Sequence, residues 1–153
     1  DGVEPSNAFR RLQSGDADYV LAFEPWGSLA ELDSLGAVVS SGARRGPLAF
    51  TSFYANRTFI ETRSESVTRL TDGLGRALDL VRETDPAKLA AIIKPWFPDF
   101  GEPLLATAIA RYQRLNLWPS DPAMTADGYT RLKSSLLSSG YISSDPAFEK
   151  VCL

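Results

Sequence analysis

The sequence contains no histidine and a single cysteine, Cys152. Without histidine, the chain cannot hold a Ser-His-Asp triad, a histidine general base, or a zinc or iron ion bound by histidine. One cysteine can form neither an internal disulfide nor a thiolate cluster for a metal. We therefore interpret Cys152 as an incidental thiol, and we expect this chain to bind no metal ion and no cofactor.

Positive charge and long apolar runs are also scarce. The 153 residues carry a formal net charge of -3, and no block of lysine and arginine provides the positive stripe that nucleic-acid phosphates require. No apolar run approaches the roughly 20 residues that cross a bilayer. A hydrophobic fraction of 44% nevertheless suits a folded globular protein. We therefore expect no nucleic-acid partner and no transmembrane segment.

Helices and strands are predicted to alternate in the first third of the chain. Ser6 and Ser28 can cap two short helices, each ended by a glycine. The short apolar runs at residues 18–23 and 37–40 are typical of buried strands. A further strand is predicted over residues 48–55, which are rich in aromatic side chains. The alternation predicts a parallel sheet covered by helices, which is an α/β fold.

From residue 64 onward the pattern predicts helices. Asp85, Pro103 and Thr125 mark the starts of three of them. Before these, a long helix is predicted from about residue 65 to 83, with apolar side chains at intervals of three and four. Its apolar stripe consists of Val67, Leu70, Leu74, Leu78 and Val81. We expect this stripe to be buried.

Several short motifs follow one another along the chain. LQSGDADYV at residues 12–20 is followed by FEPW at 23–26, and later come GPLAFT at 46–51, WFP at 96–98, IARY at 109–112 with LW at 117–118, and GYI at 140–142. In this order they resemble the solute-binding proteins that serve ABC transporters for nitrate, sulfonates, taurine and thiamine-precursor pyrimidines. The resemblance covers nearly the whole chain, but only the C-terminal part of such a protein.

This resemblance implies a fold and an organisation. The fold is a type II periplasmic-binding-protein-like, three-layer α/β/α architecture, here an incomplete portion with a helix-rich C-terminal half. Residues 1–46 would be the C-terminal part of the second lobe, 47–55 a crossover strand, and 56–153 a helical return to the first lobe. We expect a missing N-terminal portion of comparable length to complete the protein, or the chain to associate with itself. A periplasmic or extracellular membrane-associated location rests on the resemblance alone.

The loop after the first predicted strand holds the main candidate ligand contacts. Open α/β sheets bind ligands at the carboxyl ends of their strands, which is where Glu24, Pro25, Trp26 and Ser28 lie. The indole offers a stacking face, and the Glu24 carboxylate suits an amine or an aminopyrimidine. This carboxylate would repel a sulfonate or nitrate unless a basic neighbour intervened. In the alternative interpretation, Glu24 joins the helix cap and Trp26 fills the surface of the lobe.

Further candidate contacts lie on the predicted crossover strand. If the resemblance holds, Thr51, Phe53 and Tyr54 lie beside the ligand cleft. Alternation along a strand puts Thr51 and Phe53 on one face and Tyr54 on the other, so only one face can meet a ligand. Packing in the core is the alternative for these aromatic side chains. Arg111 and Tyr112 are interpreted as an inter-helix hydrogen-bonding pair.

The predicted function is that of the substrate-binding component of an ABC importer and not that of an enzyme, with no catalytic residue. Such a protein captures a small polar nitrogen-containing or sulfonate-type solute in a cleft between its lobes and delivers it to a permease. Two alternatives remain. A ligand-sensing regulatory module would use the same cleft. An enzyme similar to the thiamine-pyrimidine synthases of this fold would need the histidine and the cysteine cluster that this chain lacks.

Overall fold

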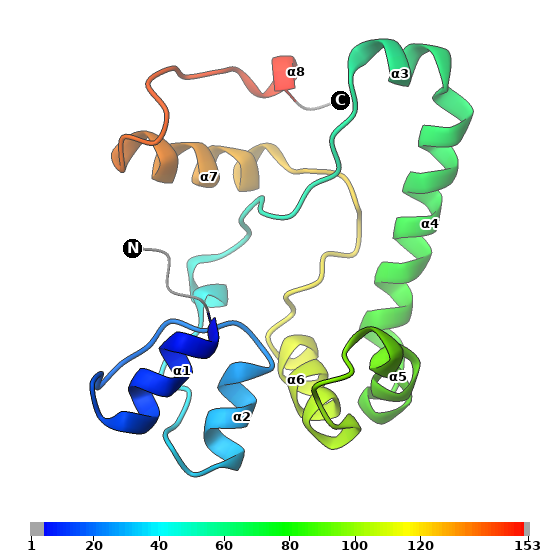
Figure 1. Cartoon of the computed structure of the whole chain (residues 1–153). Coiled ribbons are helices and arrows are strands. Elements are labelled where there is room, and N and C mark those ends of the chain that lie inside the picture. Colours follow the sequence, from blue (N-terminus) through cyan, green and yellow to red (C-terminus); the bar gives the residue numbers. More distant parts are fainter. Residues whose placement is uncertain (1–4, 152–153) are drawn as a thin grey trace. The chain divides into compact units, whose positions relative to one another are not determined.

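The computed structural model describes residues 5–151 and divides the chain into two units (Figure 1). The first unit combines the chain up to Ser41 with Leu80–Trp118, and the second combines Gly42–Asp79 with the chain from Pro119 onward. Cys152, interpreted above as an incidental thiol, lies outside the described residues.

The first unit is built around two packed helices. α5 (Pro86–Ile93) lies against α6 (Glu102–Arg114), and the two share a core of Leu89, Ala90, Leu105 and Ile109. Partly buried neighbours, including Val81, Phe100 and Trp118, cover this core. α2 (Trp26–Leu32) packs on α6, and α1 (Pro5–Ser14) packs on α2. The short helix η2 (Lys94–Trp96) follows α5. Burial of these aliphatic side chains is the main force holding the first unit together.

Local signals set the ends of these helices. The Asp85 carboxylate accepts hydrogen bonds from the N–H groups of Ala87 (3.0 Å) and Lys88 (3.1 Å), and Pro86 takes the first helical position of α5. Gly15, with φ of +75°, follows the last residue of α1 in the left-handed conformation that glycine adopts without steric cost. The cap at Asp85 and the stop at Gly15 confirm the sequence-based predictions. The predicted cap at Ser6 and the predicted stop at Gly36 are wrong, because Ser6 lies inside α1 and α2 ends at Leu32.

The second unit contains the short helices η1 (Gly42–Arg45), α3 (Arg57–Thr62) and α8 (Phe148–Val151), together with α7 (Ala126–Ser138). The hydroxyl of Thr125 accepts from the N–H of Gly128 and caps α7, as predicted. Tyr129 anchors the C-terminal segment, since its hydroxyl donates to the carbonyl of Pro146 at 2.9 Å and its ring meets that of Phe148 at 5.5 Å. Tyr129 and the ion pair between Lys133 and Asp145 therefore tie the C-terminal segment to α7.

The predicted long helix is confirmed as α4 (Ser64–Glu83), but its apolar stripe is not buried as expected. No residue of α4 is buried among the described residues, and Leu70 is 47% exposed. Val67, Leu74 and Leu78 are half-buried. Val81, near the C-terminal end, is the stripe residue that packs against the core of the first unit. The periodicity therefore predicted the helix correctly and its packing wrongly.

The α/β prediction is wrong for the described part of the chain. Residues 5–151 form helices, turns and irregular segments with no strand, so there is no three-layer α/β/α architecture in this part. The runs predicted as strands, residues 18–23, 37–40 and 48–55, are irregular and largely exposed, with Leu21 93% exposed.

The physical reason is the absence of neighbours for these runs. A strand is stable only when an adjacent strand pairs with its N–H and C=O groups, and β-propensity acts through packing against such a neighbour. The N–H of Ala49 donates instead to the carbonyl of Gly128, at the start of α7. Phe23 accepts from the N–H of Trp26, which closes a turn. Composition alone therefore overstated the strand content.

Candidate functional site

The candidate site begins with the turn that leads into α2. The peptide bond between Glu24 and Pro25 is cis, and α2 starts at Trp26. The Glu24 carboxylate accepts a hydrogen bond from the N–H of Ser28 at 3.0 Å. Ser28 is therefore inside the helix, and the prediction that its own side chain caps α2 is wrong. A carboxylate satisfies a free N–H group at the start of this helix, which suits the positive end of the helix dipole.

Gly27 allows this carboxylate to lie close to the helix. A Cβ atom at this position would lie 3.3 Å from Glu24 Oε1 and 3.4 Å from Val38 Cγ2. Both distances are at or below the limit of ordinary van der Waals contact. The sequence Glu24-Pro25-Trp26-Gly27 therefore combines the capping acid with the small residue that makes room for it.

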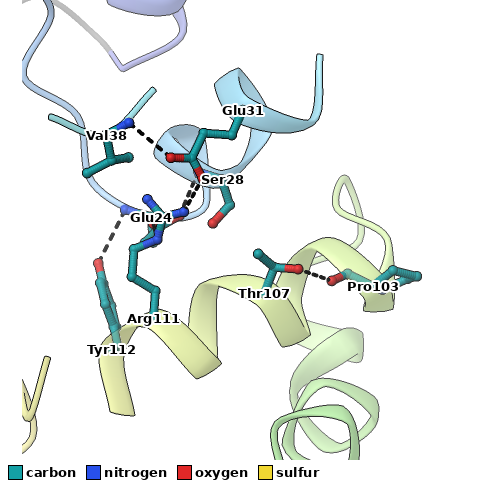
Figure 2. A network of polar contacts seen from close by, with 8 residues as sticks. All are labelled: Glu24, Ser28, Glu31, Val38, Pro103, Thr107, Arg111 and Tyr112. Atoms are coloured by element: carbon teal, nitrogen blue, oxygen red, sulfur yellow. Dashed lines mark hydrogen bonds and ion pairs between the residues drawn. The ribbon is translucent and has the colours of Figure 1, made fainter. Parts of the chain in front are cut away.

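Arg111 and Tyr112 of α6 hold the same turn from the other side, as Figure 2 shows. Arg111 Nε lies 3.1 Å from Glu24 Oε1, and the Arg111 guanidinium also binds the Glu31 carboxylate. The Tyr112 hydroxyl accepts from the backbone N–H of Glu24 at 3.2 Å. These contacts confirm the prediction that Arg111 and Tyr112 make inter-helix polar contacts, and they fix α2 on α6.

The cluster is buried on one side and more open on the other. The Glu24 side chain is 8% exposed and that of Arg111 is 11% exposed, whereas that of Glu31 is 38% exposed. The pKa of Glu31 lies below its ordinary value, first because its carboxylate accepts from the N–H of Val38 at 2.9 Å, and then because it binds Arg111. The positive charge of Arg114 lowers this pKa further.

Glu24 therefore serves the fold, as the alternative interpretation of its role proposed. Its Oε1 faces Arg111 and its Oε2 faces the N–H of Ser28. The Ser28 hydroxyl is buried and has no hydrogen-bond partner among the described residues. Direct contact of Glu24, Pro25 or Ser28 with a ligand remains a prediction.

Trp26 borders an open apolar hollow in the first unit, which we call the Trp26 hollow. Its volume is about 700 Å³. Two aromatic contacts hold the indole, one with Phe9 at 5.4 Å between ring centroids and one with Phe100 at 5.7 Å in an edge-to-face arrangement. The hollow is lined by Trp26, Leu29, Leu32, Asp99, Phe100, Gly101, Pro103 and Leu104. Asp99 and the start of α6 were not predicted as site residues.

The second group of predicted contacts belongs to the other unit. Thr51, Phe53 and Tyr54 are exposed in an irregular segment of the second unit, and Tyr54 is 90% exposed. The structure brings together Glu24, Pro25, Trp26 and Ser28 in the first unit. The role of this second group remains a prediction.

A comparison with known proteins adds a finding about function. The chain is 25% identical over 139 residues to a protein of Bacillus subtilis (strain 168) named "Putative binding protein YtlA". The chain resembles a binding protein. The match covers 90% of this chain and 42% of the relative, so the chain spans less than half the length of the protein it matches. No protein-family model and no solved structure matches the chain.

Two further observations bear on what the site can hold. Within residues 5–151, no group of three or more acidic, histidine or cysteine side chains could hold a metal ion. None of the described helices is both long enough and apolar enough to cross a membrane. The side chains that line the Trp26 hollow are aromatic, aliphatic and, at Asp99, a carboxylate.

Proposed function

We propose that this chain is part of the substrate-binding component of an ABC importer, which captures a small polar nitrogen-containing or sulfonate-type solute. The observation that carries the proposal is the similarity to a binding protein over 139 residues. The relative is named as a binding protein and not as an enzyme. The Trp26 hollow supports a binding role, because ligand sites are concave and mostly apolar with a few polar groups.

In this proposal Trp26 is the central contact. Its indole has a fixed position between Phe9 and Phe100, and a preorganised aromatic side chain loses little conformational entropy when it binds a ligand. Glu24, Pro25 and Ser28 form the turn and the first residues of α2 that position the indole, and contact of these three residues with the ligand is part of the proposal. Ligand contact by Thr51, Phe53 and Tyr54 is proposed from the resemblance to solute-binding proteins alone.

Arg111 changes what the charge of Glu24 implies for the ligand. A carboxylate alone would repel a sulfonate, but Arg111 lies 3.1 Å from it and compensates its charge. Sulfonate-type solutes therefore stay within the proposed class.

The proposal also includes partner proteins and a cellular location. An ABC permease would receive the solute at the outer face of a membrane, in the periplasm or outside the cell. The rest of a longer polypeptide, or a second copy of this chain, would cover exposed apolar side chains such as Tyr19, Leu21 and Val39, since large exposed apolar patches mark interaction surfaces.

A thermal-shift screen of the full-length protein tests the proposal. A ligand present at 100 times its dissociation constant stabilises the folded state by about 2.7 kcal/mol, which raises the melting temperature by several degrees. The panel should contain amines, aminopyrimidines, taurine and other sulfonates, and nitrate. We expect at least one class to stabilise the protein, and Trp26→Ala to abolish the shift.

Trp96→Ala is the matched control, because Trp96 is 73% exposed and does not line the Trp26 hollow. This variant should retain the shift. If no class stabilises the protein, or if both variants behave alike, the proposed function is wrong.

A further inference from the structure

The walls of the Trp26 hollow are apolar on both sides. Trp26, Leu29 and Leu32 come from successive turns of α2, and Phe100, Pro103 and Leu104 come from the loop before α6 and its first turn. A volume of about 700 Å³ falls within the range of small-molecule sites. These walls would hold the apolar body of a ligand and would not by themselves select its charge.

Asp99 gives the hollow a negative charge. Among the described residues that line it, Asp99 alone is ionisable. Its side chain is exposed, and within residues 5–151 its carboxylate forms no hydrogen bond or ion pair. The nearest cation along the chain, Lys94, donates instead to the carbonyls of Phe97 (3.4 Å) and Pro98 (2.9 Å). The Asp99 carboxylate is therefore available to a ligand.

The polar cluster next to Trp26 supplies no cation to the hollow. None of Glu24, Glu31 and Arg111 lines it, and the Arg111 guanidinium lies against the two carboxylates. A positive charge on a ligand would be complementary to Asp99, whereas a sulfonate in the hollow would face this carboxylate without a cation.

We propose that the Trp26 hollow binds an amine with a compact aromatic body, with the ring against Trp26 and Phe100 and the ammonium group at Asp99. This inference rests on the proposed function and narrows it, because it chooses the nitrogen-containing class. It also assigns the charge recognition to Asp99 in place of Glu24, whose two oxygens have partners within the fold.

Calorimetry with three probes of similar shape tests the inference on the full-length protein: 2-phenylethylamine, 2-phenylethanol and 3-phenylpropionate. We expect the amine to bind most tightly and the carboxylate most weakly. Asp99→Asn should lower the affinity for the amine by about two- to fivefold, since an exposed ion pair contributes little more than that. It should leave the affinity for the alcohol unchanged. Asp99→Lys should reverse the order of amine and carboxylate.

The matched control is Asp18→Asn, which removes an exposed carboxylate of the same unit that lies outside the lining of the hollow. It should leave all three affinities unchanged. Trp26→Phe keeps an aromatic ring where Trp26→Ala could disturb the fold, and it should retain the preference for the amine.

Each of the following results would contradict the inference. Equal binding of amine and carboxylate, or an effect of Asp18→Asn equal to that of Asp99→Asn, would show that Asp99 does not select the ligand. If no probe binds while a sulfonate or nitrate stabilises the protein in the thermal-shift screen, this inference fails and the proposed function stands. If neither experiment detects a ligand, both fail.

Discussion

Replacing Arg111 by methionine should destabilise the first unit strongly. The guanidinium lies 3.1 Å from the Glu24 carboxylate, and the two side chains are 11% and 8% exposed. Methionine fills part of the same volume but leaves Glu24 as a buried charge whose remaining partner is the N–H of Ser28. Removing one member of a buried ion pair costs about 3–5 kcal/mol. A domain of this size has a total stability of about 5–15 kcal/mol, so this loss is a large fraction of it.

Urea titration followed by circular dichroism measures this effect. At a slope of about 2 kcal/mol per molar urea, the loss lowers the unfolding midpoint by about 1.5–2.5 M. The double variant Glu24→Gln with Arg111→Met removes both charges, and it should recover part of the stability. The coupling energy between the two positions should lie between about 0.5 and 3 kcal/mol.

Arg114→Met provides the control, because Arg114 is an exposed arginine near the end of the same helix. Its effect should stay within about 0.5 kcal/mol. Should Arg111→Met change the stability as little as Arg114→Met, or should the effects of Glu24→Gln and Arg111→Met simply add, the polar cluster does not hold α2 on α6.

Three other outcomes can be checked by unfolding experiments. Leu105→Ala should cost about 2–5 kcal/mol because Leu105 is 3% exposed, whereas Leu74→Ala, on the open face of α4, should cost roughly 1 kcal/mol; equal losses would contradict the packing described above. Asp85→Ala should cost about 1 kcal/mol through the lost cap of α5, and Asp85→Asn much less. The pKa of Glu31 is lowered in the folded state, so its charged carboxylate stabilises the fold. This stabilisation is complete above the ordinary pKa of 4.5 and is lost as the pH falls through the folded value. Glu31→Gln should therefore reduce the loss of stability on acidification, and an unchanged pH profile of stability would refute this.

Local signals in the sequence predicted most of the helices. Asp85 with Pro86 and Thr125 cap helices as expected, because a cap depends on atoms two or three residues away. Strands depend on partners far away in the sequence, and for this reason the runs at residues 18–23 and 48–55 misled the prediction. Their apolar side chains indicated burial, but the described residues supply no strand to pair with them.

The site was predicted in part. The order of residues placed Glu24 and Trp26 correctly at the start of a helix, yet it could not show that Glu24 faces Arg111, which lies 87 positions later. The sequence did single out Arg111 and Tyr112, as an inter-helix pair. The sequence carried no signal for Asp99, because nothing in it shows that the loop before α6 and α2 line one hollow.

The most direct test of the binding role follows the indole N–H signals of the three tryptophans by NMR while a stabilising solute is added to the full-length protein. Single Trp→Phe variants assign the signals. The Trp26 signal should move to saturation with the dissociation constant found by calorimetry, and the signal of the exposed Trp96 should stay in place. A solute that binds without moving the Trp26 signal, or that moves the Trp96 signal just as far, would contradict a ligand site at Trp26.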